Sequence, residues 1–341
     1  MTLRSPDTVA RHPLDRDGVV ELAVLERAGL AESRHLGAAV VTAPDGTVLR
    51  EVGDGAALVY GRSSLKLFQA VAVMRSGVEL DGEQAVLAAA SHVGSAEHVR
   101  VARAILSRAA ATEDDLQCPP DWPLDRAAMF AAHDTGHGAR RITMNCSGKH
   151  ASFLLACAQN DWSASDYLDP AHPLQRLVRA TIEEFTGEAV GNVGIDGCGA
   201  PVFATSLTGL ALGVGRVSGA VANGGDASAA RLAAAIVASP WAIRGVRRTN
   251  TIVIERLGLV AKIGAEGVLV LGTADGTGVA IKILDGSSRA TTLVGLELLC
   301  SVGAVDRALA DSVIAETTER VLGGGVSVGS LRASPALTQR P

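Results

Sequence analysis

The chain has 341 residues, of which 48% are hydrophobic and only 3% aromatic, and its formal net charge is −5. Such a chain can bury one large core or two moderate ones, filled by many small aliphatic side chains. The absence of any long run of like charge excludes a nucleic-acid footprint, and no segment reaches the apolar length of a membrane span. Because the first residues lack an apolar signal core, we expect a globular cytoplasmic protein with no nucleic-acid or membrane partner.

The first part of the chain predicts a leader and then a β-hairpin. Residues 1–18 are polar and mixed in charge, so we expect them to be flexible. Residues 35–41 and 47–53 have the aliphatic and β-branched composition of strands, and they flank Pro44-Asp45-Gly46, which favours a tight turn. Two antiparallel strands are the expected result.

Helices are expected through the middle of the chain. They are predicted to begin at Ser64 and to cover residues 83–90, 95–110, 145–159, 172–186 and 229–238. Residues 118–123 contain three prolines, which cannot take part in a strand ladder, so this stretch is expected to be irregular. Residues 194–201 are spaced by glycines and predict tight backbone turns.

Strands are expected to return late in the chain, over residues 259–262, 267–271 and 278–283. A helix over residues 290–302 and a helical stretch to Leu322 follow, and residues 323–341 are expected to be a disordered tail. Late strands that return beside an early hairpin make one mainly antiparallel sheet. The predicted fold is α+β, an antiparallel sheet flanked by helices with an inserted helical region, in a single domain over residues 19–322.

The motif that organises the chain is Ser63-x-x-Lys66. On a helix this spacing places the hydroxyl and the amine on one face, one turn apart. The amine can take the proton of the hydroxyl if burial or a second cation lowers its pKa. Penicillin-binding proteins and serine β-lactamases use this pair, but most such spacings lie on a helix surface, so the motif alone is a weak indication of catalysis.

The five cysteines are expected to be thiols or metal ligands rather than disulfides, because their number is odd and no export signal is present. Cys146 and Lys149 share one helix face near a helix N-terminus, where thiolates are stabilised, and Cys198 lies in a loop flexible enough to approach them. Two thiolates suit zinc. The alternative is ordinary buried thiols, which is the role we expect for Cys157 and Cys300.

Six motifs together resemble those of the asparaginase II-like family, the Ser-x-x-Lys asparaginases. The resemblance extends from His35 to Val302, and the third and fifth motifs are its most specific parts. The motifs are Arg62-Ser63-Ser64-Leu65-Lys66, Ala90-Ser91-His92, Cys146-Ser147-Gly148-Lys149-His150, Asp169-Pro170-Ala171-His172-Pro173-Leu174-Gln175, Asp196-Gly197-Cys198-Gly199-Ala200-Pro201 and Lys262-Ile263-Gly264-Ala265-Glu266-Gly267.

The resemblance implies hydrolysis of L-asparagine to L-aspartate and ammonia on a serine-β-lactamase-like fold. Ser63 would be the nucleophile and Lys66 its base, with Ser91 and Lys262 as a second pair. Two lysines close together lower each other's pKa, so one can be neutral while the other is charged. Without the resemblance, Lys262 would be read as the surface end of a strand. One departure is Val93, where the family commonly has a small hydroxyl residue; valine cannot make the hydrogen bond that such a hydroxyl would make.

The resemblance also implies a zinc ion held by Cys146, Cys198 and an unusual lysine ligand, Lys149, which tunes the site rather than performing the hydrolysis. Because zinc normally takes four ligands, a water or a substrate atom would complete the shell. His150 could compete as a ligand, but it faces about 100° away from Lys149 on a helix. We therefore predict that His150 supports the ligands or contacts the substrate.

Two charged residues are candidates for substrate binding. Arg62 suits the α-carboxylate of an amino acid, because guanidinium pairs well with carboxylates; its alternative partner is a structural acid. Asp196 could bind the α-ammonium group or orient the amine of Lys149; its alternative role is an Asx-type turn before Gly197.

Three functions are compatible with these residues. The first is a serine amidohydrolase acting on L-asparagine, which we expect to be a homodimer. The second is the same fold acting on glutamine, a D-amino acid amide or a β-lactam, since function depends on the site rather than the fold. The third is a non-catalytic zinc-binding homologue, against which the retention of both serines, both lysines and both cysteines counts.

Overall fold

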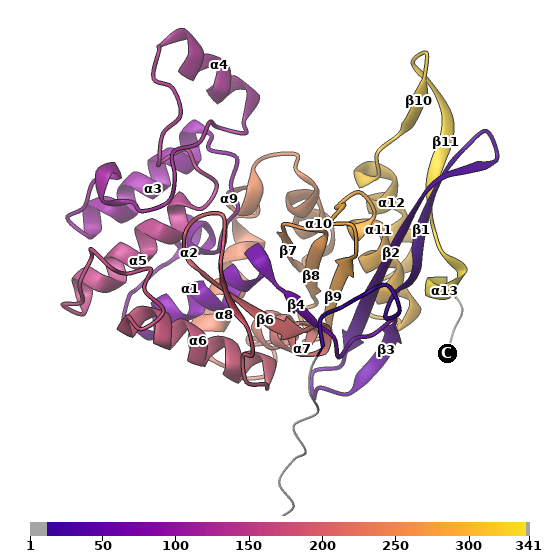
Figure 1. The fold of residues 1–341 in the computed structure, drawn as a ribbon, viewed down its shortest axis with the longest axis horizontal. Coiled ribbons are helices and arrows are strands. Elements are labelled where there is room, and N and C mark those ends of the chain that lie inside the picture. The colour runs from indigo at the N-terminus through magenta and orange to yellow at the C-terminus, as the bar shows by residue number, and fades with distance from the viewer. Residues whose placement is uncertain (1–11, 339–341) are drawn as a thin grey trace, which may run out of the picture.

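A large antiparallel sheet forms the right-hand half of the molecule in Figure 1, and a helical lobe forms the left-hand half. The computed structural model describes residues 12–338. The strands of the large sheet follow the order β10 (Val321–Gly323), β11 (Val326–Ala333), β1 (Val20–Arg27), β2 (Leu30–Thr42), β9 (Gly278–Ile283), β8 (Val268–Gly272) and β7 (Val260–Gly264), with β3 (Val48–Val52) also paired to β2.

Both faces of the central strands are covered by helices. Leu271 and Gly272 are consecutive in β8, so they face opposite sides of the sheet. Leu271 lies against Gly295 of α11 (Thr291–Ser301), whereas a side chain on Gly272 would meet Ser218 and Val214 of α7 (Leu207–Ser218). The continuous burial of β8 follows from this double cover.

The helical lobe is inserted between the early and the late strands of the sheet. A second, three-stranded sheet, β4 (Leu58–Tyr60), β6 (Pro201–Ser206) and β5 (Val193–Ile195), connects the two halves. The lobe and its flanks contain η1 (Arg62–Leu65), α1 (Lys66–Arg75), α2 (Gly82–Ala89), α3 (Ala96–Arg108), η2 (Glu113–Asp115), α4 (Arg126–Asp134), α5 (Ser147–Gln159), α6 (Pro173–Thr186), α8 (Ala227–Ala238), α9 (Trp241–Arg244) and α10 (Thr249–Leu257). Helices α12 (Arg307–Thr317) and α13 (Pro335–Thr338) complete the chain.

The predicted fold class is confirmed. The early hairpin β2–β3 and the late strands β7, β8 and β9 belong to one antiparallel sheet, as expected from their order in the chain. The sheet with its flanking helices, the inserted helical lobe and the Ser-x-x-Lys motif at their junction give the serine-β-lactamase-like layout that the resemblance implied.

The two ends of the chain need correction. Of the expected leader, residues 1–11 lie outside the described part, while Pro13 forms a bridge with Leu58 and Leu14 donates a backbone hydrogen bond to the same residue. The helical stretch expected to reach Leu322 ends at Thr317. Residues 323–338 are not a disordered tail, because β11 pairs along β1 and adds an outer strand to the sheet.

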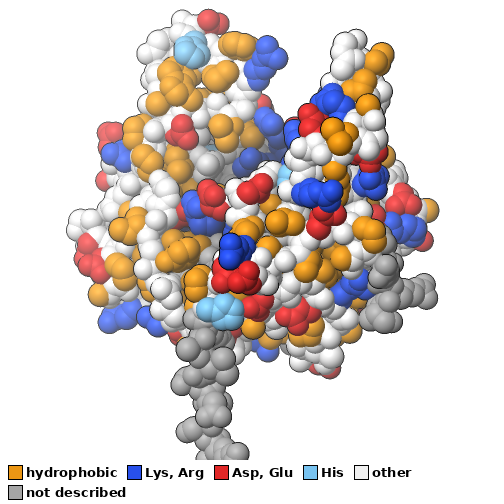
Figure 2. All heavy atoms as spheres, turned by 45° about the vertical axis from the view of Figure 1, so that its right-hand side comes forward, with side chains coloured by type: hydrophobic (Ala, Val, Ile, Leu, Met, Phe, Trp, Pro, Cys, Tyr) orange, Lys and Arg blue, Asp and Glu red, His pale blue; other side chains and the backbone are white. Residues whose placement is uncertain are grey.

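Two projections flank a hollow on the face shown in Figure 2, one carrying α4 and the other the β10–β11 hairpin. Acidic and basic side chains are intermixed over this face. None of the helices in residues 12–338 combines the length and the apolar character needed to cross a bilayer.

Candidate active site

Ser63 and Lys66 lie where the small sheet meets the helical lobe. Strand β4 ends at Tyr60, and Arg62 adopts a left-handed backbone conformation with φ of 50°, which turns the chain into η1. A non-glycine residue held in this region is strained and is found often at functional sites. Ser64 is buried and donates its hydroxyl to Gly61 O at 2.6 Å, whereas Ser63 is partly exposed. Ser63 is therefore the serine available to a substrate.

The amines of Lys66 and Lys262 converge on the hydroxyl of Ser91. Lys66 Nζ lies 3.1 Å from Ser91 Oγ and donates to Ala90 O at 2.7 Å. Lys262 Nζ lies 2.8 Å from the same hydroxyl and donates to Ile263 O at 2.8 Å. Three segments far apart in the chain, α1, the loop after α2 and β7, thus bring together the second Ser-Lys pair that the resemblance implied.

Both amines are buried and neither has a carboxylate partner within residues 12–338. Lys66 and Lys262 are each only 1% exposed. Burial, followed by repulsion from the Lys66 and Arg244 cations, places the pKa of Lys262 well below its ordinary range. A neutral Lys262 amine can accept a proton from the Ser91 hydroxyl, which in turn contacts Lys66.

Ser63 and Lys66 are not hydrogen-bonded to each other. The amine of Lys66 is directed to Ala90 and Ser91, and the Ser63 hydroxyl has no hydrogen-bond partner among the described residues. Catalytic hydrogen bonds are often loose without substrate and tighten in the Michaelis complex. Activation of Ser63 by Lys66 therefore stays a prediction.

Backbone contacts hold Ser91 in place. Ser91 N donates to Ile243 O at 3.1 Å, and Arg244 Nη1 donates to Ser91 O at 3.0 Å. The next residue, His92, contacts the Ser147 hydroxyl at 3.0 Å through Nε2, which ties this loop to the start of α5. Val93 is buried, and its side chain packs against Gly245. A Cβ atom on Gly245 would lie only 2.7 Å from Val93 Cγ2. Val93 thus makes an apolar contact where the resemblance led us to expect a hydroxyl.

The second cluster contains sulfur. Lys149 Nζ donates to Cys198 Sγ at 3.0 Å, and both residues are 1% exposed. The neighbouring Cys146 and Lys149 side chains hold the pKa of Cys198 far below that of an ordinary thiol, against the effect of burial. Cys146 Sγ donates to Asn145 Oδ1 at 2.9 Å, and the nearby Cys198 together with burial raises the pKa of Cys146. The cluster thus places two cysteine sulfurs together with the amine of Lys149, which donates to one of them.

Close packing of α5 on α2 positions this cluster. A side chain on Gly148 would place Cβ only 2.5 Å from Leu87 Cγ, so the glycine of the Cys-Ser-Gly-Lys-His motif permits the close approach. Cys146 and Lys149 both influence the pKa of Cys198, and Lys66 is close enough to influence the pKa of Cys146. The sulfur cluster and the lysine pair are therefore adjacent.

His150 is enclosed between the sulfur cluster and Tyr167. Its Nδ1 lies 2.8 Å from Tyr167 Oη, and its Nε2 is buried without a hydrogen-bond partner. Burial lowers the pKa of His150 to about 4, so the ring is neutral and its Nε2 can accept a proton or bind a metal. Cys118, for which the sequence indicates no role, is buried nearby, and desolvation raises the pKa of its thiol to about 12.

These residues fit a zinc ion. Within residues 12–338 no three Cys, His, Asp or Glu side chains are placed to enclose a metal, so a site here needs Lys149 as a third ligand. A thiolate in contact with an amine, a second thiol and a buried unpartnered imidazole nitrogen form a donor set that suits zinc. All five cysteines are free, as the sequence predicts.

Arg62 and Asp196 form an ion pair at the mouth of the site. Arg62 Nε donates to Asp196 Oδ1 at 2.8 Å, and the same oxygen accepts from Gly197 N at 2.9 Å. Two of the roles left open by the sequence, a structural acid for Arg62 and an Asx-type turn for Asp196, are thus present. Asp196 Oδ2 has no partner among the described residues and remains available to a substrate.

Arg244 was missed by sequence reasoning. It ends α9, a four-residue helix that no pattern predicted, and it reaches Ser91 across 153 residues of chain. For the lysines of the site, the sequence did contain a usable signal, because lysine is rare in this chain. The chain has only four lysines, and Lys66, Lys149 and Lys262 are all buried here.

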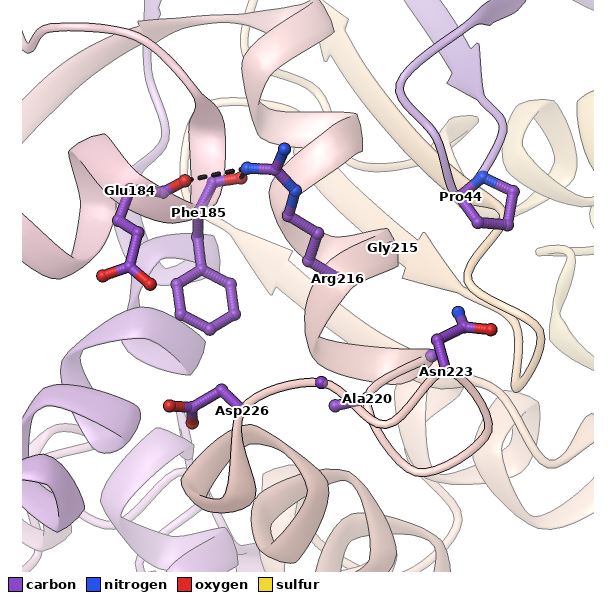
Figure 3. A pocket seen from close by; sticks show the side chains of 10 residues that line it. Pro44, Glu184, Phe185, Gly215, Arg216, Ala220, Asn223 and Asp226 are labelled. Atoms are coloured by element: carbon purple, nitrogen blue, oxygen red, sulfur yellow. Dashed lines mark hydrogen bonds between the residues drawn. The ribbon is translucent and has the colours of Figure 1, made fainter.

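The clearest cavities lie elsewhere. One of about 250 Å³, shown in Figure 3, is lined by Phe185, Arg216 and Asp226 and adjoins the far end of α1. A larger one of about 910 Å³ runs between α3, α4 and the loop around Val246. Neither is lined by a predicted site residue.

The chain was compared with known proteins. Among curated proteins none matches it. Solved structures that it resembles include a protein named Mglu in its native form (13% identity, 81% of this chain and 67% of that chain, TM-score 0.42). Others are a Bacillus glutaminase (13%, 82% and 90%, TM-score 0.36) and the Bacillus subtilis glutaminase YbgJ in covalent complex with 5-oxo-L-norleucine (13%, 82% and 87%, TM-score 0.34). These overlaps are too loose to carry an argument.

A family model gives the assignment instead. The model described as L-asparaginase II matches residues 23–333, which includes the sheet, the helical lobe and every residue of the site described above. The chain therefore belongs to the L-asparaginase II family.

Proposed function

We propose that this amidohydrolase converts L-asparagine to L-aspartate and ammonia. The observation that carries the proposal is the Ser91 hydroxyl held between two buried amines, beside a serine with a free hydroxyl. Amide hydrolysis needs a nucleophile, a base and an acid for the leaving ammonia. Ser63, Lys66, Ser91 and Lys262 supply groups of each kind.

The reaction proceeds in two steps. The Ser63 oxygen attacks the side-chain amide carbon while its proton passes to Lys66, and the carbon–nitrogen bond breaks as a proton from the Lys66–Ser91–Lys262 chain reaches the nitrogen. Ammonia leaves and an ester to Ser63 remains. Water then attacks this ester and gives up a proton to the same chain, which returns a proton to the Ser63 oxygen as the ester carbon–oxygen bond breaks. The acid product loses its remaining proton to solvent and leaves as the carboxylate.

Asp196 is the proposed partner of the substrate α-ammonium group. Its Oδ2 is open, and Arg62 and Gly197 fix the carboxylate through the other oxygen. An anion held in this way can orient a cationic group without rearranging. His150 is buried behind the sulfur cluster, so its predicted role beside the ligands is better supported than contact with the substrate.

We also propose that Cys146, Lys149 and Cys198 hold a zinc ion, with a water completing the shell. When bound, zinc supplies a fixed positive charge beside the lysine pair, which favours neutral amines. Binding requires Lys149 and Cys146 to lose their protons, so zinc affinity should rise with pH.

L-Glutamine is the alternative substrate. One additional methylene changes binding in an apolar pocket by only about 1–3 kcal/mol, so discrimination between the two amides depends on details of pocket depth. D-Amino acid amides and β-lactams are further alternative substrates on the same fold. A non-catalytic zinc-binding homologue is the remaining alternative. The homodimer and the cytoplasmic location remain predictions from the sequence.

Ammonia release from a panel of amides tests the proposal. L-Asparagine, L-glutamine, D-asparagine and a β-lactam are each supplied to the wild-type protein and to the Ser63→Ala variant. We expect the highest kcat/KM for L-asparagine and no release by the variant. A higher kcat/KM for L-glutamine would make L-glutamine the substrate in place of L-asparagine. If wild-type protein releases no ammonia from any amide, the non-catalytic homologue is favoured.

A further inference from the structure

The guanidinium group of Arg244 contacts the backbone of Ser91 and has no carboxylate partner within residues 12–338. Its Nη1 donates to Ser91 O at 3.0 Å, and its other two nitrogens have no hydrogen-bond partner among the described residues. Those two nitrogens are not among the fully buried unpartnered atoms, so solvent reaches them. Arg244 therefore offers free donors beside Ser91.

The charges around Arg244 are of one sign. Burial and then repulsion from Arg248 lower its pKa, and no carboxylate acts in the opposite direction. Arg244 in turn contributes to the lowered pKa of Lys262. Three basic side chains, those of Lys66, Lys262 and Arg244, surround Ser91, and none has an ion-pair partner in the described part of the chain.

Arg75, another partly buried arginine, binds Glu184 through two nitrogens. Arg50 and Arg141, also partly buried, donate to backbone carbonyl groups and have no carboxylate partner among the described residues, but neither contacts the residues of the site. Arg62, the residue that the sequence suggests for the substrate carboxylate, already donates to Asp196. An unpaired partly buried guanidinium is costly unless a ligand supplies the missing anion.

We propose that Arg244 binds the α-carboxylate of the amino-acid substrate. This inference rests on the proposed function, because it names the group that receives one end of the amino acid. The α-ammonium would lie at Asp196, the α-carboxylate at Arg244 and the side-chain amide at Ser63. Two charged anchors of opposite sign then select a free amino acid over an asparagine inside a peptide, whose α-groups are uncharged amides.

The rival role for Arg244 is structural, a clamp on the backbone of Ser91. The two roles differ in their dependence on the substrate. 3-Aminopropanamide is L-asparagine without its α-carboxylate; it keeps the amine and the reacting amide. A clamp would serve both substrates equally, whereas a carboxylate anchor serves L-asparagine alone.

The test compares kcat/KM for L-asparagine and 3-aminopropanamide in Arg244→Gln. Loss of a charge-assisted hydrogen bond predicts a fall of about 100-fold for L-asparagine and less than about 3-fold for 3-aminopropanamide. Arg244→Lys keeps the charge and should recover part of the preference for L-asparagine. Equal falls with both substrates would overturn the proposal in favour of the clamp.

Arg62→Gln is the matched control. It weakens the support of Asp196, which binds a group that both substrates share, so kcat/KM should fall by a similar factor for both. A loss confined to L-asparagine in Arg62→Gln, and absent in Arg244→Gln, would move the carboxylate site to Arg62.

Binding separates this inference from the proposed function. If wild-type protein releases no ammonia from L-asparagine or L-glutamine, the proposed function has failed. Calorimetry then compares L-aspartate with β-alanine, which lacks the α-carboxylate, on Ser63→Ala protein. Arg244→Gln in that background should weaken L-aspartate at least about 10-fold and leave β-alanine unchanged. No binding of L-aspartate, or equal weakening of both, would contradict the role of Arg244.

Discussion

Helix α1 begins with a lysine and ends with an arginine, and these two basic side chains have opposite surroundings. Lys66 at the first position is 1% exposed, and its amine contacts a carbonyl and a hydroxyl but no carboxylate. Arg75 at the last position donates two hydrogen bonds to Glu184, at 2.6 and 2.8 Å, and one to Asp226 at 3.0 Å. The guanidinium also lies 5.2 Å from the centre of the Phe185 ring.

The helix dipole increases this difference. The C-terminal end of a helix favours a cation and the N-terminal end disfavours one. Arg75 is therefore stabilised by its partners and by the helix, and its hydrogen bonds to Glu184 raise its pKa against the effect of burial. Lys66 has neither advantage. The end of α1 that carries the paired Arg75 therefore stabilises the fold. The end that carries Lys66, a buried amine without a carboxylate partner, belongs to the proposed active site.

The largest effect is expected at the reacting end, from Ser63→Ala. Removing a nucleophile usually costs at least about a thousandfold in kcat, and because the Ser63 hydroxyl makes no hydrogen bond within the described residues, stability should not change. Ammonia release and thermal unfolding measure the two quantities. If more than about a tenth of the wild-type kcat persists, Ser63 is not the nucleophile.

Lys66→Met should lower kcat by a similar factor and should not destabilise the protein. Methionine fills similar volume and removes a buried amine that has no acid partner, so the desolvation cost of that amine disappears. Urea unfolding of the variant should therefore give a free energy of unfolding at least equal to that of wild type. A clear loss of stability would mean that Lys66 is structural, like Arg75.

The sulfur cluster adjoins the lysine pair, and the zinc ion that we propose there can be assayed directly. Purified protein never exposed to chelator should carry up to one zinc per chain by elemental analysis. Cys198→Ser should reduce the occupancy to near zero, because loss of a thiolate ligand removes most of the affinity. Cys157→Ser, outside the cluster, is the control and should keep its zinc. Absence of zinc from the wild-type protein would make the thiols structural.

The pH dependence of kcat/KM should report the coupled lysines. Activity requires a neutral amine, so kcat/KM should rise with pH, and the limb should lie well below the ordinary lysine range because the pKa of Lys262 is lowered. Lys262→Met leaves one amine without its repelling neighbour, so the limb should move to higher pH, by about one unit or more. Lys282→Met, on β9, should leave it in place. A limb that is unchanged or lower in Lys262→Met would remove Lys262 from the site.

Local patterns were sufficient for part of the fold. Strand runs and the Pro44-Asp45-Gly46 turn predicted the hairpin, and three late apolar runs became β7, β8 and β9. The strands β1, β10 and β11 on one side of the sheet were missed. β1 carries charges at Glu21, Glu26 and Arg27, and its identity as a strand depends on pairing with β2 and β11. Gly324 and Gly325, read as part of a disordered tail, have positive φ and form the turn of the β10–β11 hairpin.

Some residues of the site could be identified from the sequence, and others could not. Motifs identified Ser91 and Lys262 through the resemblance, and the structure brings both to Lys66. Arg244 belongs to no motif, because its position depends on a tertiary contact between Ile243 and Ser91. The sequence left two roles open for Arg62 and for Asp196, a structural contact or substrate binding. It could not decide between them, since either charge could face a substrate.

The smallest effect on activity is expected at the far end of α1, from Arg75→Met. The change leaves Glu184 and Asp226 without their shared cation, and a partly buried pair of this kind contributes about 2 kcal/mol to the free energy of unfolding. Arg256→Met removes an exposed ion pair with Glu316 and should cost less than about 0.5 kcal/mol. Both variants should keep wild-type kcat/KM, because neither alters the lysine pair. If Arg75→Met lowered kcat/KM about tenfold at full stability, the two ends of α1 would be coupled, and the distinction between a reacting end and a structural end would fail.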